Sequence, residues 1–297
     1  MSAVARTVYM VDASIYVFRA WHSMPDHFTD SEGWPTNAVQ GFARFLLDLL
    51  EQTRPEHIVI AFDQSLDQCY RNEIYPPYKA NRSPAPEDLL RQFAYCRALC
   101  EALGLPVLGD LRYEADDLIG SVLNHLRPQG FRGVIVSADK DLSQLLAGTD
   151  EQWDFARGLR WTHNEVIDKH GVHAHQIADY LALAGDAIDN IPGVPGIGGK
   201  TAAALLGHFG SLEELLRRVD EVPHLSNLRG AKSVAAKLRE HGELARLYRQ
   251  LTVIALDAPL GDVSHGFARG QADPERLQTL VESLRLGPVT KRRLSAC

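Results

Sequence analysis

Three short apolar segments of this chain each lead to an aspartate, and this pattern constrains the fold more than any other. The segments are TVYMV before Asp12, HIVIAF before Asp63 and GVIV before Ser137-Ala138-Asp139. Helical patterns lie between them, for example at residues 38–50 and 87–103. Strands that alternate with helices predict a mostly parallel α/β sheet. The ligand site of such a sheet lies beyond the carboxyl ends of its strands, so the three aspartates are expected at one edge.

Further carboxylates are expected at the same edge. Glu114 and Asp117 open a helical pattern and share a face at this spacing, and Asp186 and Asp189 are also three residues apart. The nine candidates are Asp12, Asp63, Glu114, Asp116, Asp117, Asp139, Asp141, Asp186 and Asp189. So much buried like charge indicates bound cations, and oxygen ligands without interleaved His or Cys favour Mg²⁺ or Mn²⁺. Two such ions, about 3.5–4 Å apart, are typical of phosphoryl chemistry.

From about residue 165 the sequence becomes helical, with patterns at residues 212–219, 232–250 and 274–286. We expect residues 186–192 to be a helix and its end, followed by a Gly/Pro-rich turn to Thr201. This turn is not a Walker P-loop, because Val194 stands where that motif needs glycine. Glycines before a helix expose N–H groups that suit phosphate, so a helix-hairpin-helix gripping a nucleic-acid backbone is one interpretation. A plain turn between helices is the other.

Residues 70–82 (YRNEIYPPYKANR) combine basic and aromatic side chains after the second predicted strand. Arg71, Lys79 and Arg82 could neutralise phosphates, while Tyr75 or Tyr78 could stack on an unpaired base. Such clusters also occur on ordinary protein surfaces. Beside a carboxylate metal site, however, this one favours a segment that grips a nucleic-acid strand.

The composition is that of a soluble globular protein, with 297 residues, 45% hydrophobic and 23% charged. There is no apolar run of about 18 residues and no signal-peptide pattern, so we expect a cytoplasmic protein with no membrane partner. The net charge of −7 weighs against a nucleic-acid partner. That objection is weak if these carboxylates bind two divalent ions. The net charge would then hide a locally positive binding surface.

On its motifs the chain resembles the bacterial and phage 5′-nucleases, flap-endonuclease-like 5′→3′ exonucleases that also form the N-terminal domain of DNA polymerase I. The resemblance covers about residues 7–260. Its motifs are VDASIYVFR at 11–19, FD at 62–63, RNEIYPPYKANR at 71–82, YEADD at 113–117, SADKD at 137–141, GDAIDNIPG at 185–193 and GIGGKT at 196–201.

The resemblance implies a PIN/5′-nuclease-like α/β fold, with a mostly parallel sheet flanked by helices and a helix-hairpin-helix-type DNA-binding region. It implies a nuclease core at residues 1–164, with a helical arch at about 72–103. Residues 165–297 would form the helical region and a C-terminal segment that packs back on the core. The first metal would be held by Asp12, Asp63, Glu114, Asp116 and Asp117. The second would be held by Asp139, Asp141, Asp186 and Asp189.

The implied activity is divalent-metal-dependent, structure-specific 5′→3′ exonuclease and flap endonuclease cleavage of DNA, with 5′-phosphate products, in replication and repair. Lys79 and Arg82 would be catalytic, by the scissile phosphate, and a K⁺ ion would sit at the hairpin turn. The implied DNA contacts are Arg19, Arg71, Tyr78, Lys79, Arg82, Gly196, Gly198, Lys200 and Thr201. Expected partners are 5′ flaps, nicked or branched duplexes and RNA-primer ends, bound by a monomer.

Three alternatives stay open at this point. A non-catalytic flap- or junction-binding protein would share the DNA contacts but lack second-set carboxylates, which this chain keeps. A PIN-like RNA nuclease would share the acidic site, and a metal-dependent phosphatase of small molecules would leave residues 160–250 unexplained. The sequence is compatible with a stand-alone nuclease and with an isolated N-terminal domain.

Overall fold

The computed structural model describes residues 6–65, 68–226 and 228–296. Its central element is a six-stranded sheet in the order β3-β2-β1-β4-β5-β6. The strands are β1 (Arg6–Asp12), β2 (His57–Ala61), β3 (Val107–Leu108), β4 (Phe131–Val136), β5 (Glu151–Asp154) and β6 (Leu159–Thr162). Neighbouring strands run parallel except for β5 and β6. The predicted mostly parallel α/β sheet is thereby confirmed.

The register of the central strands brings their carboxyl ends to one level. Val11 of β1 pairs with Ile60 of β2 on one side and with Val136 of β4 on the other. The side chains of all three residues are fully buried, as expected for strands covered on both faces. The acids that follow these strands, Asp12, Asp63 and Asp139, therefore leave the sheet at the same edge.

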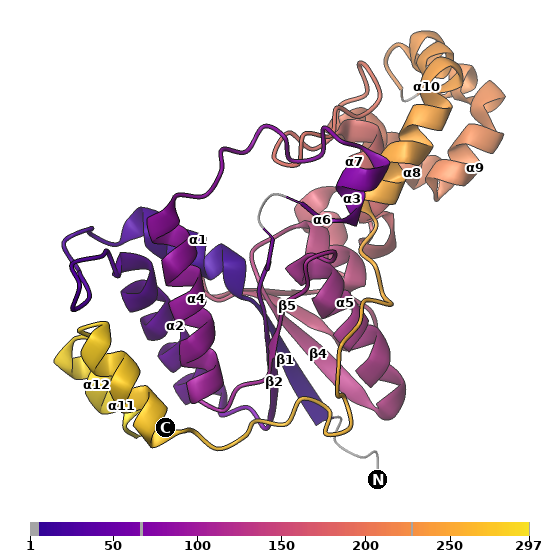
Figure 1. The fold of residues 1–297 in the computed structure, drawn as a ribbon. Helices are drawn as coiled ribbons and strands as arrows, with labels where there is room; N and C mark the ends of the chain where they lie inside the picture. Colours follow the sequence, from indigo (N-terminus) through magenta and orange to yellow (C-terminus); the bar gives the residue numbers. More distant parts are fainter. Residues whose placement is uncertain (1–5, 66–67, 227, 297) are drawn as a thin grey trace.

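Helices cover both faces of the sheet (Figure 1). One hydrophobic cluster joins the sheet to α1 (Ala13–Ser23), α2 (Asn37–Thr53) and α4 (Glu87–Ala102), and the other joins it to α5 (Ala115–Leu126). Successive residues of β1 serve the two clusters in turn: Met10 packs on the α5 side and Val11 on the α1 side. This alternation follows from the pleat of a strand. The last two helices, α11 (Pro274–Ser283) and α12 (Pro288–Leu294), pack against α4 and α2.

The second half of the chain is helical, as predicted. Its helices are α6 (Val166–His170), α7 (Ile177–Ala184), α8 (Gly199–Phe209), α9 (Leu212–Arg217) and α10 (Ala231–Thr252). Short 3-10 helices lie in the core at Arg127–Gln129 and Asp141–Leu145, and in the second half at Ala174–Gln176 and Val219–His224. The long helix α10 packs on α7 and also reaches α3 (Tyr70–Ile74), which connects this half to the core.

The predicted helix at residues 186–192 is wrong. α7 ends at Ala184, and residues 185–193, here called the acidic loop, form a tight loop instead. The backbones of Asp186 and Ile191 exchange hydrogen bonds of 2.7 and 2.8 Å across it. Gly185 and Asn190 have positive φ values of 83° and 57°, which a helix cannot contain. Asp186 and Asp189 are thus placed by a closed loop and not by a helical turn.

The structure also contains one hairpin that was not predicted and an arch that differs from the predicted one. The antiparallel hairpin of β5 and β6 was not predicted; its turn ends at Gly158, whose φ of 66° suits glycine. The predicted arch at 72–103 is helical only in α3 and α4, and residues 75–86 between them contain no helix. Pro76, Pro77, Pro84 and Pro86 explain this, because each removes a backbone donor. Figure 1 shows this connection passing above the sheet from α3 to α4.

None of the helices in the described ranges combines the length and the apolar character needed to cross a membrane.

Candidate active site

A cleft at the carboxyl edge of the sheet gathers most of the predicted acidic residues. Eight of the nine carboxylates line it: Asp12, Asp63, Glu114, Asp116, Asp139, Asp141, Asp186 and Asp189. They come from the ends of β1, β2 and β4, the start of α5 and the acidic loop. The sheet register and the closed acidic loop together bring these distant parts of the sequence to one place.

Asp12 is fixed between the ends of two neighbouring strands. It is the last residue of β1 and the N-cap of α1, where its carboxylate accepts the backbone N–H of Ile15 at 3.4 Å. Its other oxygen accepts the hydroxyl of Ser137, just beyond β4, at 2.9 Å. Such side-chain caps satisfy an otherwise unpaired donor at a helix start. The side chain is therefore held rigidly at the cleft.

Asp63 is held by the start of α5. Its carboxylate accepts the backbone N–H of Ala115, the first residue of that helix, at 2.9 Å. Its own backbone N–H donates to the hydroxyl of Ser14 at 3.0 Å. The N-terminus of a helix favours negative charge, so α5 supports the acid that faces it.

Burial and mutual repulsion raise the pKa values of several acids in the cleft. Burial raises the pKa of Asp12 to about 7, and the charges of Asp63 and Asp139 add to the rise. Burial is also the first cause of a raised pKa at Asp116 and Asp141, followed in both by the charge of Asp139. Carboxylates this close ionise together only when a cation neutralises them.

The donor set fits a hard divalent cation. Asp141 Oδ1 is buried and has no hydrogen-bond partner among the described residues, which is costly for a carboxylate oxygen. The other ligands available in the cleft are also carboxylate oxygens, the type that Mg²⁺ and Mn²⁺ prefer. Within the described ranges, however, no three His, Cys, Asp or Glu side chains form a ready-made metal site.

Cationic side chains within the cleft lie between these acids. Lys79 forms an ion pair with Glu114, Arg82 pairs with Asp189 at 2.8 Å, and Lys140 pairs with Asp186 at 2.6 Å. Burial would raise the pKa of Glu114, but the charges of Lys79 and Arg71 outweigh burial and lower it. Burial would lower the pKa of Lys140, but the charge of Asp141 and its bond to Asp186 raise it. Sequence reasoning missed Lys140, although it stands between two predicted ligands.

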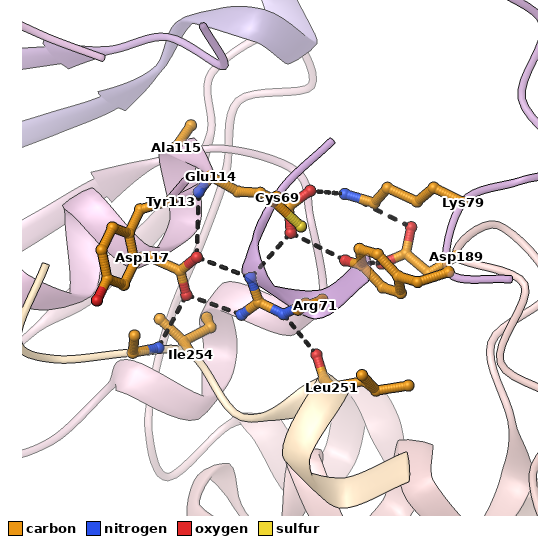
Figure 2. A network of polar contacts seen from close by, with 12 residues as sticks. Cys69, Arg71, Lys79, Tyr113, Glu114, Ala115, Asp117, Asp189, Leu251 and Ile254 are labelled. Carbon is orange, nitrogen blue, oxygen red and sulfur yellow. Dashed lines mark hydrogen bonds and ion pairs between the residues drawn. The ribbon is translucent and has the colours of Figure 1, made fainter. Parts of the chain in front are cut away.

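Asp117 does not line the cleft, although it was predicted as a metal ligand. Figure 2 shows its side chain turned towards Arg71, whose guanidinium binds both of its oxygens at 2.7 Å. Arg71 also donates to Glu114 at 3.0 Å and to the carbonyl of Leu251 at 2.7 Å. Arg71 was predicted to contact DNA, yet only 3% of its side chain is exposed. The structure gives both residues a place inside the protein.

Tyr78 is buried as well, so its ring offers no free face for a base in this structure. Its hydroxyl lies 2.9 Å from Glu114 Oε2 and 3.1 Å from Asp189 Oδ2. Burial raises the pKa of Tyr78, and the charges of these two acids raise it further. A neutral hydroxyl thus bridges acids of the two predicted metal sets.

The segment 77–82, here called the arch base, is bonded to the acidic loop at several points. The side-chain amide of Asn190 donates to the carbonyl of Pro77 at 2.6 Å, and that of Asn81 donates to the carbonyl of Ala187 at 2.8 Å. The backbone N–H of Lys79 donates to the carbonyl of Asp189 at 3.0 Å. Lys79 and Asn190 both have left-handed backbones, with φ values of 56° and 57°. The two loops therefore form one unit.

The remaining predicted DNA contacts lie outside the cleft. Gly196, Gly198 and Lys200 are exposed, and Thr201 is half-buried, at the turn before α8 and in its first residues. Arg19 is exposed on α1. At the hairpin turn, the ammonium of Lys237 lies so close to Gly196 that a Cβ at this glycine would collide with it.

Comparisons with known proteins match this geometry. The family model "5′-3′ exonuclease, N-terminal resolvase-like domain" matches residues 7–175. The model "5′-3′ exonuclease, C-terminal SAM fold" matches residues 172–275. DNA polymerase I of Pseudomonas aeruginosa is 40% identical over 276 residues, which are 93% of this chain and 30% of that protein. DNA polymerase I of Rhizobium leguminosarum is 34% identical over 98% of this chain and 28% of its own length. The chain thus spans less than a third of each relative.

Solved structures share the fold at low sequence identity. The phage T5 5′-exonuclease with bound zinc superposes with a TM-score of 0.69 and 18% identity, over 98% of this chain and 97% of that one. The catalytic core of Rad2 in complex with a DNA substrate gives a TM-score of 0.64 and 16% identity, over 98% and 90%. The fold is therefore that of these two structures along almost the whole chain.

Proposed function

The chain belongs to the 5′-3′ exonuclease family, and on that premise we propose that it is a divalent-metal-dependent, structure-specific 5′→3′ exonuclease and flap endonuclease. Its substrate would be DNA, cut to 5′-phosphate products in replication and repair. One observation carries the proposal: eight carboxylates line a single cleft, and several of them have raised pKa values that a cation would relieve. Metal-dependent hydrolysis of phosphodiesters needs such a site.

In this proposal the cleft holds two Mg²⁺ or Mn²⁺ ions. The first set of ligands is Asp12, Asp63, Glu114 and Asp116, and the second is Asp139, Asp141, Asp186 and Asp189. Asp117 is not a ligand in this proposal. It holds Arg71, which in turn donates to Glu114 of the first set. When bound, the ions would supply an activated water and neutralise charge on the departing oxygen.

Lys79 and Arg82 would act on the scissile phosphate. Both line the cleft, where Lys79 forms an ion pair with Glu114 and Arg82 forms one with Asp189. Metal ions at those acids would free the two cations to stabilise the charge that develops on the phosphate. A stacking role for Tyr78 would need its ring to leave the buried position beside Glu114.

The exposed hairpin turn would hold the duplex away from the cut. Gly196 and Gly198 leave backbone N–H groups accessible, and Lys200 adds a positive charge. Arg19 would contact the strand near the cleft. Contacts to the backbone carry no sequence information, so flaps, nicked or branched duplexes and RNA-primer ends would be recognised by shape. The predicted K⁺ ion would share the turn with the ammonium of Lys237.

The two predicted parts of the chain would have different roles. Residues 1–164 would cut, and residues 165–297 would position the duplex, in a monomer that acts on cytoplasmic DNA. The family models meet at residues 172–175, close to this boundary.

A double-labelled 5′-flap duplex tests the function. We expect the full chain to release the flap or short 5′ products in Mg²⁺, but not in EDTA. Asp186→Asn should abolish cleavage and leave flap binding nearly intact, because it removes a ligand and no DNA contact.

The same experiment separates the rival function. Tight flap binding without cleavage in Mg²⁺ or Mn²⁺ would establish a non-catalytic flap- or junction-binding protein. Full activity of Asp186→Asn at saturating Mg²⁺ would refute the two-metal assignment instead.

A further inference from the structure

Lys140 occupies the point where the second set of carboxylates converges. It lies between Asp139 and Asp141 in the sequence, at the end of the loop that follows β4. Its ammonium reaches across the cleft to the acidic loop, where Nζ lies 2.6 Å from Asp186 Oδ2. The same nitrogen lies 3.7 Å from Asp141 Oδ1. One lysine thus connects two stretches of chain whose acids would have to share a metal ion.

The acids around Lys140 are not otherwise satisfied. Asp141 Oδ1 is buried and accepts no hydrogen bond from the described residues. Asp186 Oδ1 accepts the backbone N–H of Ile188 at 2.8 Å, within the acidic loop itself. Lys140 therefore supplies the positive charge nearest to this pair, and a buried Asp186 beside a half-buried Asp141 would be costly without any cation.

We propose that the Lys140 ammonium is a tethered counter-ion of the second set, and that a divalent ion must displace it from Asp186 in order to bind there. The identity of the ion rests on the proposed function, but the competition for Asp186 does not. An ammonium 2.6 Å from Asp186 Oδ2 occupies one lone pair of that oxygen and repels a second cation at the same carboxylate, so the two cations compete for Asp186.

The side chain can leave without disturbing the fold. It is 36% exposed, whereas that of Asp186 is 6% exposed, so the lysine can swing into solvent while the acid stays in place. Lys140 thereby lowers the affinity of the second set for metal. By reciprocity, whatever binds the second set also releases the lysine towards a phosphate in the cleft.

Calorimetric titration of Mn²⁺ into the full chain, without DNA, tests this inference. Asp186→Asn first identifies the binding component that belongs to the second set, because that component should disappear. Lys140→Met should then tighten the same component about tenfold, within the usual range of coupling between two competing ligands. Lys140→Arg keeps the positive charge and should stay within about twofold of the unmodified chain.

A second lysine of the same cleft provides the matched control. Lys79→Met removes a cation that pairs with Glu114 in the first set and lies 3.9 Å from Asp189 Oδ1 in the second. Because none of its ion pairs is with Asp186, the Asp186-dependent component should change less than with Lys140→Met. If Lys140→Met left that component unchanged or weaker, the inference would be overturned. Lys140→Gln repeats the comparison with a polar neutral side chain, in case the methionine lowers thermal stability.

The two proposals can fail separately. Tightened Mn²⁺ binding in a chain that never cleaves flap DNA would sustain the counter-ion role and refute the nuclease. Flap cleavage together with unaltered Mn²⁺ affinity and a lower kcat in Lys140→Met would make Lys140 a phosphate contact, and the counter-ion role would fall.

Discussion

The guanidinium of Arg71 binds both carboxylate oxygens of Asp117 at 2.7 Å beneath the acidic cleft. The two side chains are 3% and 0% exposed, so water does not share the interaction. Arg71 stands on α3, Asp117 on α5, and the carbonyl of Leu251, which also accepts from Arg71, on α10. One buried pair therefore fixes the start of the arch, the first set of acids and the helical half relative to one another.

Loss of Arg71 should destabilise the protein strongly. Arg71→Met leaves Asp117 buried without its partner, and removal of one member of a buried pair typically costs about 3–5 kcal/mol. Urea unfolding of the metal-free chain measures the loss. Arg112→Met is the matched control: Arg112 binds Glu73 with the same two-point geometry, but both side chains are more than half exposed. Its cost should be below about 1 kcal/mol. Equal stability of the two variants, with weaker flap binding only in Arg71→Met, would favour the predicted DNA contact.

Glycine 193 should be irreplaceable in the acidic loop. Its φ is 69°, and a Cβ there would lie 2.6 Å from the carbonyl carbon of Ala184, inside the neck of the loop. Gly193→Ala should therefore lower the free energy of unfolding by more than about 1 kcal/mol. Gly207→Ala is the control, because nothing lies within 4 Å of a Cβ at this position in α8. That variant should gain about 0.5–1 kcal/mol from helix propensity. An unchanged free energy of unfolding for Gly193→Ala would contradict the close approach of Gly193 to the backbone of Ala184.

Asn190 should control the mobility of the arch base. Asn190→Gly tolerates the left-handed backbone but loses the amide that binds the carbonyl of Pro77. We expect faster tryptic cleavage after Lys79 and Arg82, because local protection from a protease reflects the local opening free energy. Asn190→Ala should show the same acceleration together with a lower melting temperature, from its strained backbone. Unchanged cleavage in both variants would mean that the remaining contacts between the two loops suffice.

The stability of the metal-free chain should fall as the pH rises. The pKa of Asp12 is about 7 in the folded protein and 3.8 as a reference for the unfolded chain. Between these values the folded state holds a proton that the unfolded state has lost, so unfolding becomes easier as the pH increases. Urea unfolding in EDTA across this window measures the slope. Asp12→Asn should reduce the slope by about one proton, and saturating Ca²⁺ should also flatten it. A stability that rises with pH in EDTA would contradict the raised pKa.

The sequence predicted the parts of the fold that depend on local patterns. The strands that precede Asp12, Asp63 and Asp139 were found with bounds shifted by only a few residues, because buried parallel strands read as continuous apolar runs. The convergence of acids followed from the general rule for ligand sites in parallel sheets. Asp12, Asp63 and Asp139 share one cleft for that reason.

The parts that depend on three-dimensional partners could not be predicted. Asp117 differs from Asp116 by one position, yet one faces Arg71 and the other faces the cleft, and only the rotation of α5 decides which. Lys140 and Arg71 are ordinary basic residues in the sequence; their roles arise from acids 46 residues away in each case. The acidic loop resembled a helix end because the bond between Asp186 and Ile191 leaves no periodic signal.

The chain passes between the core and the helical half twice. It leaves the sheet through α6, and after α10 it returns along the core, where Arg269, Gly270 and Asp273 donate backbone hydrogen bonds to it before α11 begins. Figure 1 shows α11 and α12, in yellow, beside α2 and α4, on the opposite side of the molecule from α9. The helical half is therefore joined to the core by the chain at both of its ends. A single peptide-bond break in either passage would leave it tethered through the other.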